Sequence, residues 1–355
     1  MRLPAALITC APRYFTAHPV EARAALAMIA DASDVLGRLL DGGHSSIAGR
    51  LAGAFRNIGR DQIAEAITAT MKSAGYTVSE TDSFADRLPV GIDPRETSPA
   101  VNRLRMSWAA MREAVLERFP PPPGLPRDVK AYLHQVEDVY ATDTYNSLSI
   151  EGYRVNADLI ERVRSGNWNP DSKADRSHQD VLAARGYWQA FQKVKDTVSR
   201  IVQEANAGEA TQADHGMWYR EMFGPSVAAG ILKPGDLAGY RDGPVYIRQS
   251  MHVPPRSEAV RELMPTFFDL LRDEPEASVR VVLGHFFFVN IHPYFDEDGR
   301  MGRFLMNAML ASGGYPWTVI PLAQRARYMN ALEAASVQGD IRPFAELVAE
   351  LVSKQ

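Results

Sequence analysis

The chain has 355 residues, a formal net charge of −4 and one cysteine. This length allows two domains with a sizeable core. The single cysteine excludes an intrachain disulfide and indicates no metal cluster, and the mild acidity gives no global argument for nucleic acid or an anionic membrane as a partner. The apolar stretch at the start is short and interrupted by prolines, and no other stretch is long and apolar enough to span a bilayer. We therefore expect a soluble, cytoplasmic protein.

Residues 1–85 are predicted to form a small accessory domain that is either helical or winged-helix-like. Apolar residues at helical spacing predict helices separated by glycines, whereas residues 75–80 predict a short strand. The following region, residues 86–99, is rich in proline and charge and is predicted to be a linker. The predicted helices of the accessory domain cover residues 20–40, 47–56 and 62–73.

Three arginines of this domain, Arg50, Arg56 and Arg60, are candidates for contacting nucleic acid. Arginines on helices more often form a solvated face, and no basic net charge accompanies them here. We therefore expect no nucleic-acid partner, and no membrane partner either.

Residues 100–355 are predicted to be mainly helical, with a helical region at 100–205 and a core domain at 206–355. Residues 237–253 contain glycines and β-type residues, which predict a hairpin instead of a helix. The predicted helices cover residues 101–118, 128–140, 144–149, 173–205, 217–223, 258–272, 277–291, 300–312, 323–336 and 343–352.

The most informative stretch is the loop that begins at His292, His-Pro-Tyr-Phe-Asp-Glu-Asp-Gly-Arg-Met-Gly-Arg. It lies between two helical runs, so Gly299 falls near the start of the second helix, where free backbone N–H groups bind anions. Arg300 and Arg303 lie on one helical face and can reach the same anion. Asp296 is a hard oxygen ligand suited to Mg²⁺, and a histidine exchanges protons near neutral pH. The loop is therefore typical of a phosphate-handling site.

Two other interpretations of this loop are weaker. Its acidic residues are similar to a calcium-binding loop, but an EF-hand alignment on Gly299 places Tyr294 and Leu305 at ligand positions and fails. The other is an ordinary corner between two helices with no function of its own.

The loop resembles the signature of the Fic (Fido) family, His-Pro-Phe-x-Asp/Glu-Gly-Asn-Gly-Arg-x-x-Arg. Six fixed positions between His292 and Arg303 match, which occurs by chance about once in 10⁷–10⁸ windows. Tyr294 conservatively replaces the Phe of the pattern. Glu297 and Asp298 replace its Gly and Asn, which places two negative charges where phosphates are expected to lie.

The resemblance covers about residues 100–352 and implies a Fic-type helical core with a β-hairpin flap. It also implies a protein adenylyltransferase that transfers AMP from Mg²⁺-bound ATP to a Tyr, Thr or Ser hydroxyl of a protein. His292 would be the general base, and Asp296 would hold Mg²⁺. The resemblance further implies a set of nucleotide-binding residues, which comprises Asp298, Gly299, Arg300, Gly302, Arg303, His252 and Tyr328.

Two aromatic residues near this set have structural alternatives. Tyr328 could be a core tyrosine instead of a base or ribose contact, because buried aromatics are common in helical cores. His285 lies two helical turns before His292, but no third ligand is present at zinc-site spacing. For His285 we therefore expect a buried, hydrogen-bonded role.

Ser147, Glu151 and Gly152 resemble the inhibitory helix pattern of the family, Ser/Thr-x-x-x-Glu-Gly/Asn. Ser147 and Glu151 are one turn apart and share a face of a helix predicted near residues 144–152. The resemblance implies that Glu151 pairs with Arg303, competes with the γ-phosphate of ATP and so inhibits the protein. A bidentate arginine–carboxylate pair has the strength that this requires. The alternative is a capped helix end with a surface glutamate.

The flap residues Val245, Tyr246, Ile247 and Arg248 resemble a target-docking edge. An exposed hairpin edge can pair with an extended protein segment and leave its hydroxyl residue near His292. The alternative is a plain surface hairpin. The sequence leaves self-modification and homo-oligomer formation open.

A second hypothesis for the whole chain comes from a different functional class. In that hypothesis the protein is a catalytically silent or differently specific Fic-type binding and regulatory module, as the two added negative charges in the signature suggest. The retention of His292 and Asp296 argues against it.

Overall fold

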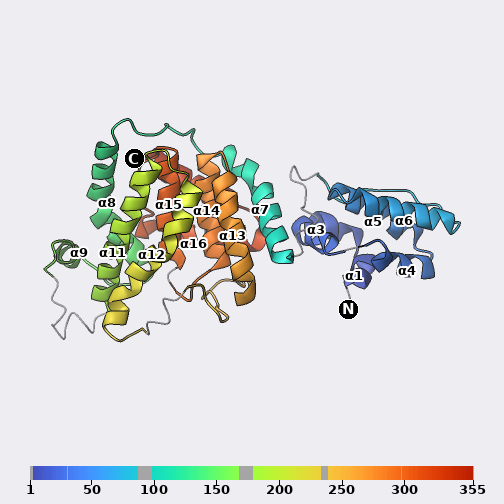
Figure 1. Cartoon of the computed structure of the whole chain (residues 1–355), viewed down its shortest axis with the longest axis horizontal. Coiled ribbons are helices and arrows are strands. Elements are labelled where there is room, and N and C mark those ends of the chain that lie inside the picture. The colour runs from blue at the N-terminus through green and yellow to red at the C-terminus, as the bar shows by residue number, and fades with distance from the viewer. Residues whose placement is uncertain are drawn as a thin grey trace. The chain divides into compact units, whose positions relative to one another are not determined.

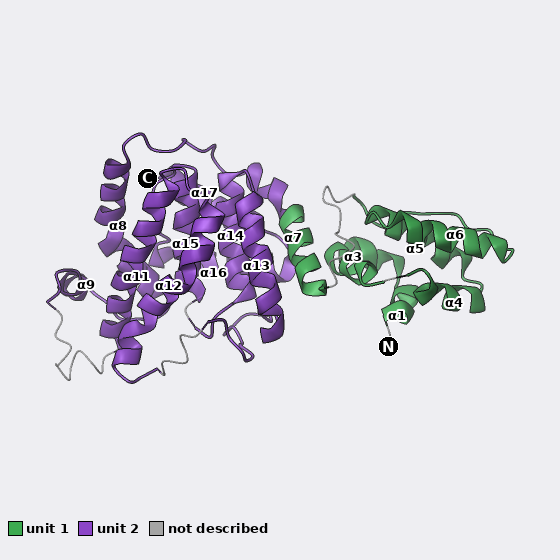
Figure 2. Cartoon of the chain, in the orientation of Figure 1, with its two compact units in different colours: residues 1–110 green, residues 111–355 purple. Residues whose placement is uncertain are grey.

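The computed structural model describes residues 3–29, 31–86, 98–167, 179–232, 239–296 and 298–354, and helices dominate it (Figure 1). The chain divides into two compact units, Met1–Ala110 and Met111–Gln355, coloured separately in Figure 2. This division falls within a helix, so the predicted boundaries after residues 85, 99 and 205 stay predictions. Within the described ranges, no helix combines the length and the apolar character needed to cross a bilayer.

The N-terminal unit consists of short helices around an apolar core. Its helices before the division are α1 (Leu3–Thr9), α2 (Pro12–Ala17), α3 (Pro19–Ala27), α4 (Ser33–Asp41), α5 (Ser45–Asn57) and α6 (Asp61–Ser73). α5 packs along α6, and α1, α3 and α4 each contact α5. Leu51, Phe55 and Ile67 are fully buried at the centre of this packing.

The short strand predicted after α6 is not present. Residues 76–83 form an extended segment that lies along α5 and pairs with no strand among the described residues. Thr81 N donates to Gly49 O over 3.2 Å. The carbonyl groups of Ser79 and Thr81 occupy the space that side chains at Gly49 and Gly53 would need. The winged-helix-like alternative is therefore not confirmed, and the described part of this unit is helical.

The three candidate arginines of this unit make contacts within it. Arg56 donates to Glu80, with Nε 2.7 Å from Oε1. Arg60 donates to the Ile29 carbonyl over 2.9 Å. Arg50 contacts a carbonyl of α1, and its guanidinium carbon lies 5.6 Å from the centre of a phenylalanine ring. These contacts give all three side chains structural roles.

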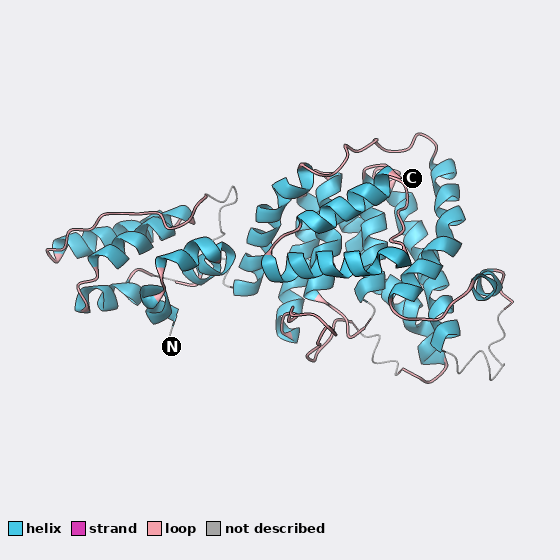
Figure 3. Ribbon diagram, turned by 180° about the vertical axis from the view of Figure 1, so that it is seen from behind, coloured by secondary structure: helices cyan, strands magenta, loops and turns pink. Residues whose placement is uncertain are grey.

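The C-terminal unit is a bundle of helices (Figures 1 and 3). Its elements, including the helix that crosses the division between units, are α7 (Pro99–Leu116), α8 (Val129–Ile150), α9 (Ala157–Arg164), α11 (Gln179–Ile201), α12 (Ala207–Ala228), α13 (Ser257–Asp273), α14 (Ala277–Ile291), α15 (Asp298–Ser312), the 3-10 turn η2 (Leu322–Gln324), α16 (Arg325–Glu333), the π-helical turn η3 (Ala334–Gln338) and α17 (Arg342–Ser353).

Helix α15 is buried because α8, α11, α12 and α14 all pack against it. Phe304 and Met309 of α15 are fully buried. Gly302 allows a close approach to α14, because a Cβ atom there would collide with Val289 and crowd His285. The surrounding helices thus fix the position of the helix that carries the second half of the signature.

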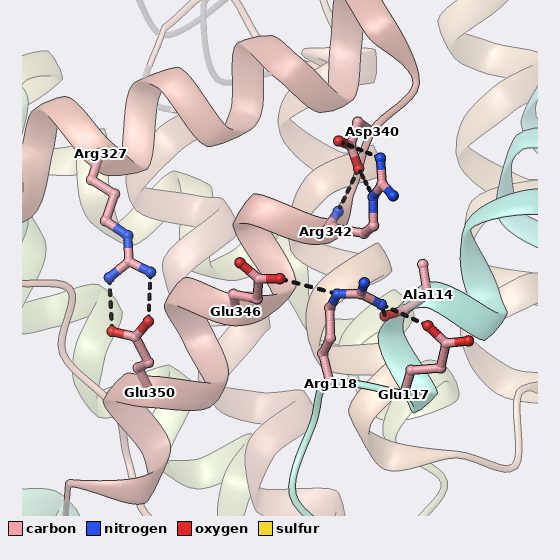
Figure 4. Close-up of polar contacts among 8 residues, drawn as sticks. All are labelled: Ala114, Glu117, Arg118, Arg327, Asp340, Arg342, Glu346 and Glu350. Carbon is pink, nitrogen blue, oxygen red and sulfur yellow. Dashed lines mark hydrogen bonds and ion pairs between the residues drawn. The ribbon is translucent and has the colours of Figure 1, made fainter.

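Ion pairs on the surface fasten α17 to its neighbours (Figure 4). Arg327 of α16 donates to both carboxylate oxygens of Glu350 over 2.8 and 2.7 Å. Arg118, which follows α7, donates to Glu346 over 3.1 Å. Exposed pairs stabilise a fold by only about 0–1 kcal/mol each. The Arg327–Glu350 pair, with two hydrogen bonds, connects α17 to α16, which carries further residues of the site.

The β-hairpin predicted at residues 237–253 is not confirmed, because the described residues contain no strand (Figure 3). Residues 237 and 238 lie outside the described ranges. Residues 239–256, which we call the flap, form a loop whose backbone bonds to neighbouring elements instead of to a second strand. Arg241 N donates to Pro293 O over 2.9 Å, and Met251 N donates to a carboxylate of α16 over 2.8 Å.

Candidate active site

The site is built around a turn at the end of α14. That helix is almost entirely apolar and buried, and it ends at Ile291. His292 follows in the left-handed conformation, with φ 53° and ψ 64°, and its N–H donates to Phe288 O over 3.1 Å. Few residues other than glycine adopt this conformation, and it typically persists only when the surroundings enforce it. The turn brings the His292 ring back beside the start of α15.

A buried arginine of the flap surrounds this turn with hydrogen bonds. Arg241 is 1% exposed. Its Nε donates to His292 O over 2.6 Å, and its Nη1 donates to Gly243 O over 2.9 Å. Its Nη2 donates to Pro255 O and, over 3.4 Å, to Ile291 O. One side chain therefore bonds to the end of α14 and to both ends of the flap.

The His292 ring is neutral at physiological pH. Burial lowers the pKa of His292 to about 4, and the positive charge of Arg241 acts in the same direction. A hydrogen bond with the Val289 backbone and the negative charge of Glu151 act against this shift. The Nε2 atom lies 3.2 Å from Oδ2 of Asp298. A neutral imidazole can accept a proton, and the imidazolium that results would lie beside a carboxylate.

Asp298 is the first residue of α15, and its side chain is fully buried. Its Oδ1 accepts a hydrogen bond from Tyr294 N over 3.2 Å, which closes the loop between the two helices. An asparagine oxygen, as in the family signature, could accept the same bond. The substitution therefore retains this contact of the loop and adds a negative charge beside His292. Glu297, the other departure from the signature, lies outside the described residues.

The first turn of α15 has the features of an anion site. Helix N-termini carry free N–H groups and partial positive charge, Gly299 and Arg300 belong to this turn, and Gly302 follows it. Arg300 is 1% exposed, and its guanidinium carbon lies 5.0 Å from the centre of the Tyr153 ring. The cation–π contact holds the guanidinium in one orientation.

A glutamate side chain already occupies this anion site. Arg303 donates from Nη2 to Oε1 of Glu151 over 2.7 Å. It also donates from Nε to the Ser147 hydroxyl over 2.9 Å and from Nη2 to Ser147 O over 3.0 Å. Burial acts to lower the pKa of Arg303, but the charge and hydrogen bond of Glu151 together with Tyr328 and Tyr187 outweigh burial, and the pKa is raised. The structure thus brings Ser147, Glu151 and Arg303 together, as the sequence predicts.

The carboxylate of Glu151 also touches the start of α15. A Cβ atom on Gly299 would collide with Glu151 Oε1. Gly299 is therefore the residue type that admits the carboxylate to the helix N-terminus, where a negative charge is favoured.

The end of the predicted inhibitory helix, α8, is fixed by several contacts. The helix ends at Ile150, Glu151 caps it, and Gly152 follows with φ 95°, which turns the chain away from the helix. Ile150 O accepts a hydrogen bond from Arg325 Nε of α16 over 2.8 Å. Asn146 Oδ1 accepts one from Leu322 N over 2.8 Å. Glu151 is thus delivered from a helix end that is bound to α16 and to the turn preceding it.

The flap presents alternating exposed and half-buried side chains beside this site. Val245 and Ile247 are half-buried, whereas Tyr246 and Arg248 are exposed. Tyr246 is 83% exposed, an unusual state for a large aromatic side chain. Met251 and Val253, also in the flap, are exposed as well.

The distal part of the flap is bound to two helices. Glu333 at the end of α16 accepts hydrogen bonds from the Ser250 hydroxyl over 2.5 Å and from Met251 N over 2.8 Å. His252 Nε2 lies 2.8 Å from Asn290 O of α14. The predicted nucleotide contact of His252 stays a prediction.

Tyr328 is buried on α16, with its hydroxyl 2.8 Å from Nε2 of His285. Burial raises the pKa of Tyr328 to about 12 and lowers that of His285 to about 3. His285 is therefore buried and hydrogen-bonded, as expected from the sequence. Tyr328 is a core tyrosine in this geometry, which offers no support for a nucleotide contact by its side chain.

Asp296 is exposed in the loop before α15. Across the part of the chain that the structure describes, no three His, Cys, Asp or Glu side chains are grouped to hold a metal ion. Mg²⁺ is commonly bound by one or two carboxylates together with phosphates and water. A single exposed carboxylate beside an anion site fits that donor set.

Three residues of this arrangement are missing from the sequence-based prediction: Arg241, Arg325 and Glu333. Each forms its contacts with residues far away in the sequence. For Arg241, the only available signal is its place beside the glycine and tyrosine that begin the flap.

Comparisons with known proteins agree with the geometry of the site. The Fic/DOC family pattern matches residues 215–310, which contain the flap and most of the signature helix. Among solved structures, Fic-1 (aa134–508) from C. elegans has a TM-score of 0.51 and 19% sequence identity, and the match covers 90% of this chain and 89% of that chain. This likeness shows that the helical fold is shared.

Curated relatives are similar over much of this chain. The protein adenylyltransferase Fic of Drosophila willistoni is 30% identical over 227 residues, which are 61% of this chain and 41% of the relative. That of Drosophila ananassae is 27% identical over 282 residues, which are 75% of this chain and 52% of the relative. The chain thus spans about half the length of the curated relatives it matches. Together with the signature, these matches support the assignment of the chain to the Fic/DOC family.

Proposed function

We propose that this protein transfers AMP from Mg²⁺-bound ATP to a Tyr, Thr or Ser hydroxyl of a protein, and that Glu151 inhibits the transfer. The observation that carries the proposal is a carboxylate held by Arg303 against the N-terminus of α15, beside a neutral His292. An anion site and a proton acceptor are thus adjacent. The names of the curated relatives, protein adenylyltransferase Fic, support the same reaction.

The phosphates of ATP bind at the first turn of α15 in this proposal. Its backbone N–H groups, near Asp298 and Gly299, surround the negative charge, and Arg300 adds a cation. Arg303 orients the γ-phosphate when Glu151 has left. Electrostatic stabilisation and positioning carry most of the catalysis of phosphoryl-type transfer, so these groups are chemically sufficient.

In the transfer step, the target hydroxyl oxygen attacks the α-phosphorus of ATP. A new oxygen–phosphorus bond forms while the bond from the α-phosphorus to the oxygen that bridges to the β-phosphate breaks. The hydroxyl proton passes to a ring nitrogen of His292, and pyrophosphate leaves with the electron pair of the broken bond. The imidazolium that results is stabilised by the Asp298 carboxylate.

Asp296 would hold Mg²⁺, which would supply positive charge to the departing pyrophosphate. The exposed position of this carboxylate beside the phosphate site supports the assignment.

Inhibition follows from competition for one cation. Glu151 uses Nη2 of Arg303 and the space above Gly299, and a γ-phosphate at the same place would meet a negative charge. ATP that binds beside Glu151 is therefore held in an unproductive position. Removal of the carboxylate frees both the guanidinium and the helix N-terminus.

The target protein docks on the flap in this proposal. The exposed Tyr246 and the non-helical backbone at Val245–Ile247 support pairing with an extended segment. The target includes the protein itself, through self-modification, and a homo-oligomer would present one copy to another.

The decisive experiment uses ATP labelled at the α-phosphate. We expect Glu151→Gly protein to label itself or a protein in a cell lysate, and wild type to label much less. Adding His292→Ala to Glu151→Gly should lower labelling by about 10²–10⁴-fold, the usual contribution of a general base. ATP labelled at the γ-phosphate should transfer no label. If the His292→Ala double variant labels as fast as Glu151→Gly, His292 is not the base.

A further inference from the structure

We propose that Arg241 is a positioning residue, which holds the His292 turn and the two ends of the flap in one arrangement so that a hydroxyl on the flap meets the His292 ring. This inference rests on the proposed function. The hydrogen bonds of Arg241 go to backbone carbonyls and to neither the His292 ring nor the start of α15, so it acts through the His292 turn and the flap.

The partners of Arg241 motivate the proposal. All the hydrogen-bond acceptors of its guanidinium are backbone carbonyls, namely those of His292, Ile291, Gly243 and Pro255. The backbone N–H of Arg241 donates to Pro293 O as well. Two of these carbonyls belong to the flap, and three belong to the turn that carries His292.

Arginine is specifically suited to this position. Its planar guanidinium carries five donors in a fixed geometry, whereas lysine carries three donors at a single point. The carbonyls of Ile291 and His292 end a helix, where partial negative charge favours a cation. Burial lowers the pKa of Arg241, whereas the negative charges of Asp298 and Glu258 raise it. A charged group is thus kept in the interior, where its hydrogen bonds orient the backbone around it.

The bonds of Arg241 converge where the backbone is least favourable. His292 adopts a left-handed conformation that a residue with a side chain rarely takes. Its carbonyl accepts a short hydrogen bond from Arg241 Nε, over 2.6 Å. Since a base must lie within hydrogen-bond reach of the proton it takes, a small rotation of this turn would misplace the ring.

Several charged or titratable groups face His292 from the surrounding elements. They are Arg241 and His252 from the flap, Asp298 from α15 and Glu151 from α8. Replacing Arg241 alone leaves the other three in place, so an effect on the ring can be assigned to this residue.

The test compares Arg241→Lys and Arg241→Gln with a matched control in the full chain carrying Glu151→Gly. Lysine keeps the positive charge but lacks the planar set of five donors, and glutamine lacks both the charge and that set of donors. The control is Arg280→Lys at the other end of α14, where a half-buried guanidinium bonds to Glu274 O and to the Ser312 hydroxyl. AMP formed from α-labelled ATP, both free and protein-bound, gives kcat and the KM for ATP, and thermal unfolding gives Tm.

We expect Arg241→Lys to lower kcat by about tenfold or more while the KM for ATP stays within about twofold, because misplaced reacting groups lower turnover without touching the phosphate site. Arg241→Gln should lower kcat further. Arg280→Lys should lower Tm and leave kcat within about twofold. If Arg241→Lys lowers only Tm, or raises only the KM for ATP, the positioning role is overturned.

A second measurement needs no transfer activity. The chain has eight histidines, and the imidazole signal of His292 in NMR is the one that His292→Ala removes. We expect Arg241→Lys and Arg241→Gln to shift this signal and Arg280→Lys to leave it in place. An unchanged signal in both Arg241 variants overturns the proposal. If the Glu151→Gly protein forms no AMP, the proposed function fails, while this measurement still decides the role of Arg241.

Discussion

Glu151 and Gly299 share one small space: Oε1 of Glu151 lies where a Cβ atom on Gly299 would be. Gly299 is in the first turn of α15 and is not among the glycines with positive φ, so its backbone conformation does not require glycine. Glycine is required there because the Glu151 carboxylate leaves no space for a Cβ atom. The identity of residue 299 and the presence of Glu151 are therefore connected by direct contact.

From this contact we predict that Gly299→Ala lowers the free energy of unfolding by about 1–3 kcal/mol in wild type, as overpacking usually does. In the Glu151→Gly protein the same change should have a much smaller effect, since the colliding atoms are gone. Urea denaturation of wild type, both single variants and the double variant measures the coupling. If Gly299→Ala lowers the free energy of unfolding equally in wild type and in Glu151→Gly, the contact between residues 151 and 299 is contradicted.

Asp298→Asn should tighten ATP binding. The variant keeps an oxygen for the bond from Tyr294 N but removes a buried negative charge at the start of α15. We expect the Kd for ATP to fall by about tenfold, or roughly 1.4 kcal/mol, in the Glu151→Gly background at low Mg²⁺. Calorimetric titration with ATP measures this, and a Mg²⁺ series reveals whether the ion offsets the charge. An unchanged Kd at every Mg²⁺ level would mean that Asp298 does not sense the nucleotide.

The buried His285 should make the fold sensitive to acid. Its folded pKa, about 3, lies below the ordinary value of 6.5, so the unfolded state binds more protons as pH falls below about 6.5. Stability is therefore lost on acidification, by about 2 kcal/mol between pH 7 and pH 5 from this one group. Urea denaturation gives the free energy of unfolding at the two pH values. In His285→Gln, the difference between these two free energies should be smaller than in wild type by that amount. An identical pH difference in both proteins would rule out this contribution.

Glu333→Ala should loosen the distal part of the flap. The variant removes the acceptor for Met251 N and the Ser250 hydroxyl, and a hydrogen bond of this kind contributes roughly 1 kcal/mol. Hydrogen exchange of peptides that cover the flap should accelerate by about fivefold. Glu350→Ala is the matched control, because it removes the Arg327 pair without touching the flap. Equal exchange rates in Glu333→Ala and wild type would contradict the prediction that Glu333 stabilises the flap.

The helices next to the site could be predicted from the sequence because their patterns are local. The prediction of residues 277–291 agrees with α14, and that of 300–312 differs from α15 only at its start. Two predicted helices, 128–140 and 144–149, are one helix, α8. No glycine or proline separates them, so the helix has no reason to stop.

Local turns inside a helical pattern, and features that depend on distant contacts, could not be predicted. The predicted helix at 20–40 is divided, and Ser33 N donates to Asp31 Oδ1 at the start of α4. Helical spacing alone does not reveal such a local stop signal. The flap contains alternating residues but no strand, because its backbone partners come from α16 and from the turn at Pro293.

The two ends of α16 connect the inhibitory helix with the flap. Arg325, its first residue, bonds to Ile150 O, and Glu333, its last, bonds to the flap at Ser250. Arg327 joins the same helix to α17. In the proposed function, the flap that docks the target and the carboxylate that inhibits the protein are therefore connected through this one short helix. Thermodynamic reciprocity then applies to them: whatever a bound target does to the affinity for ATP, ATP does to the affinity for the target.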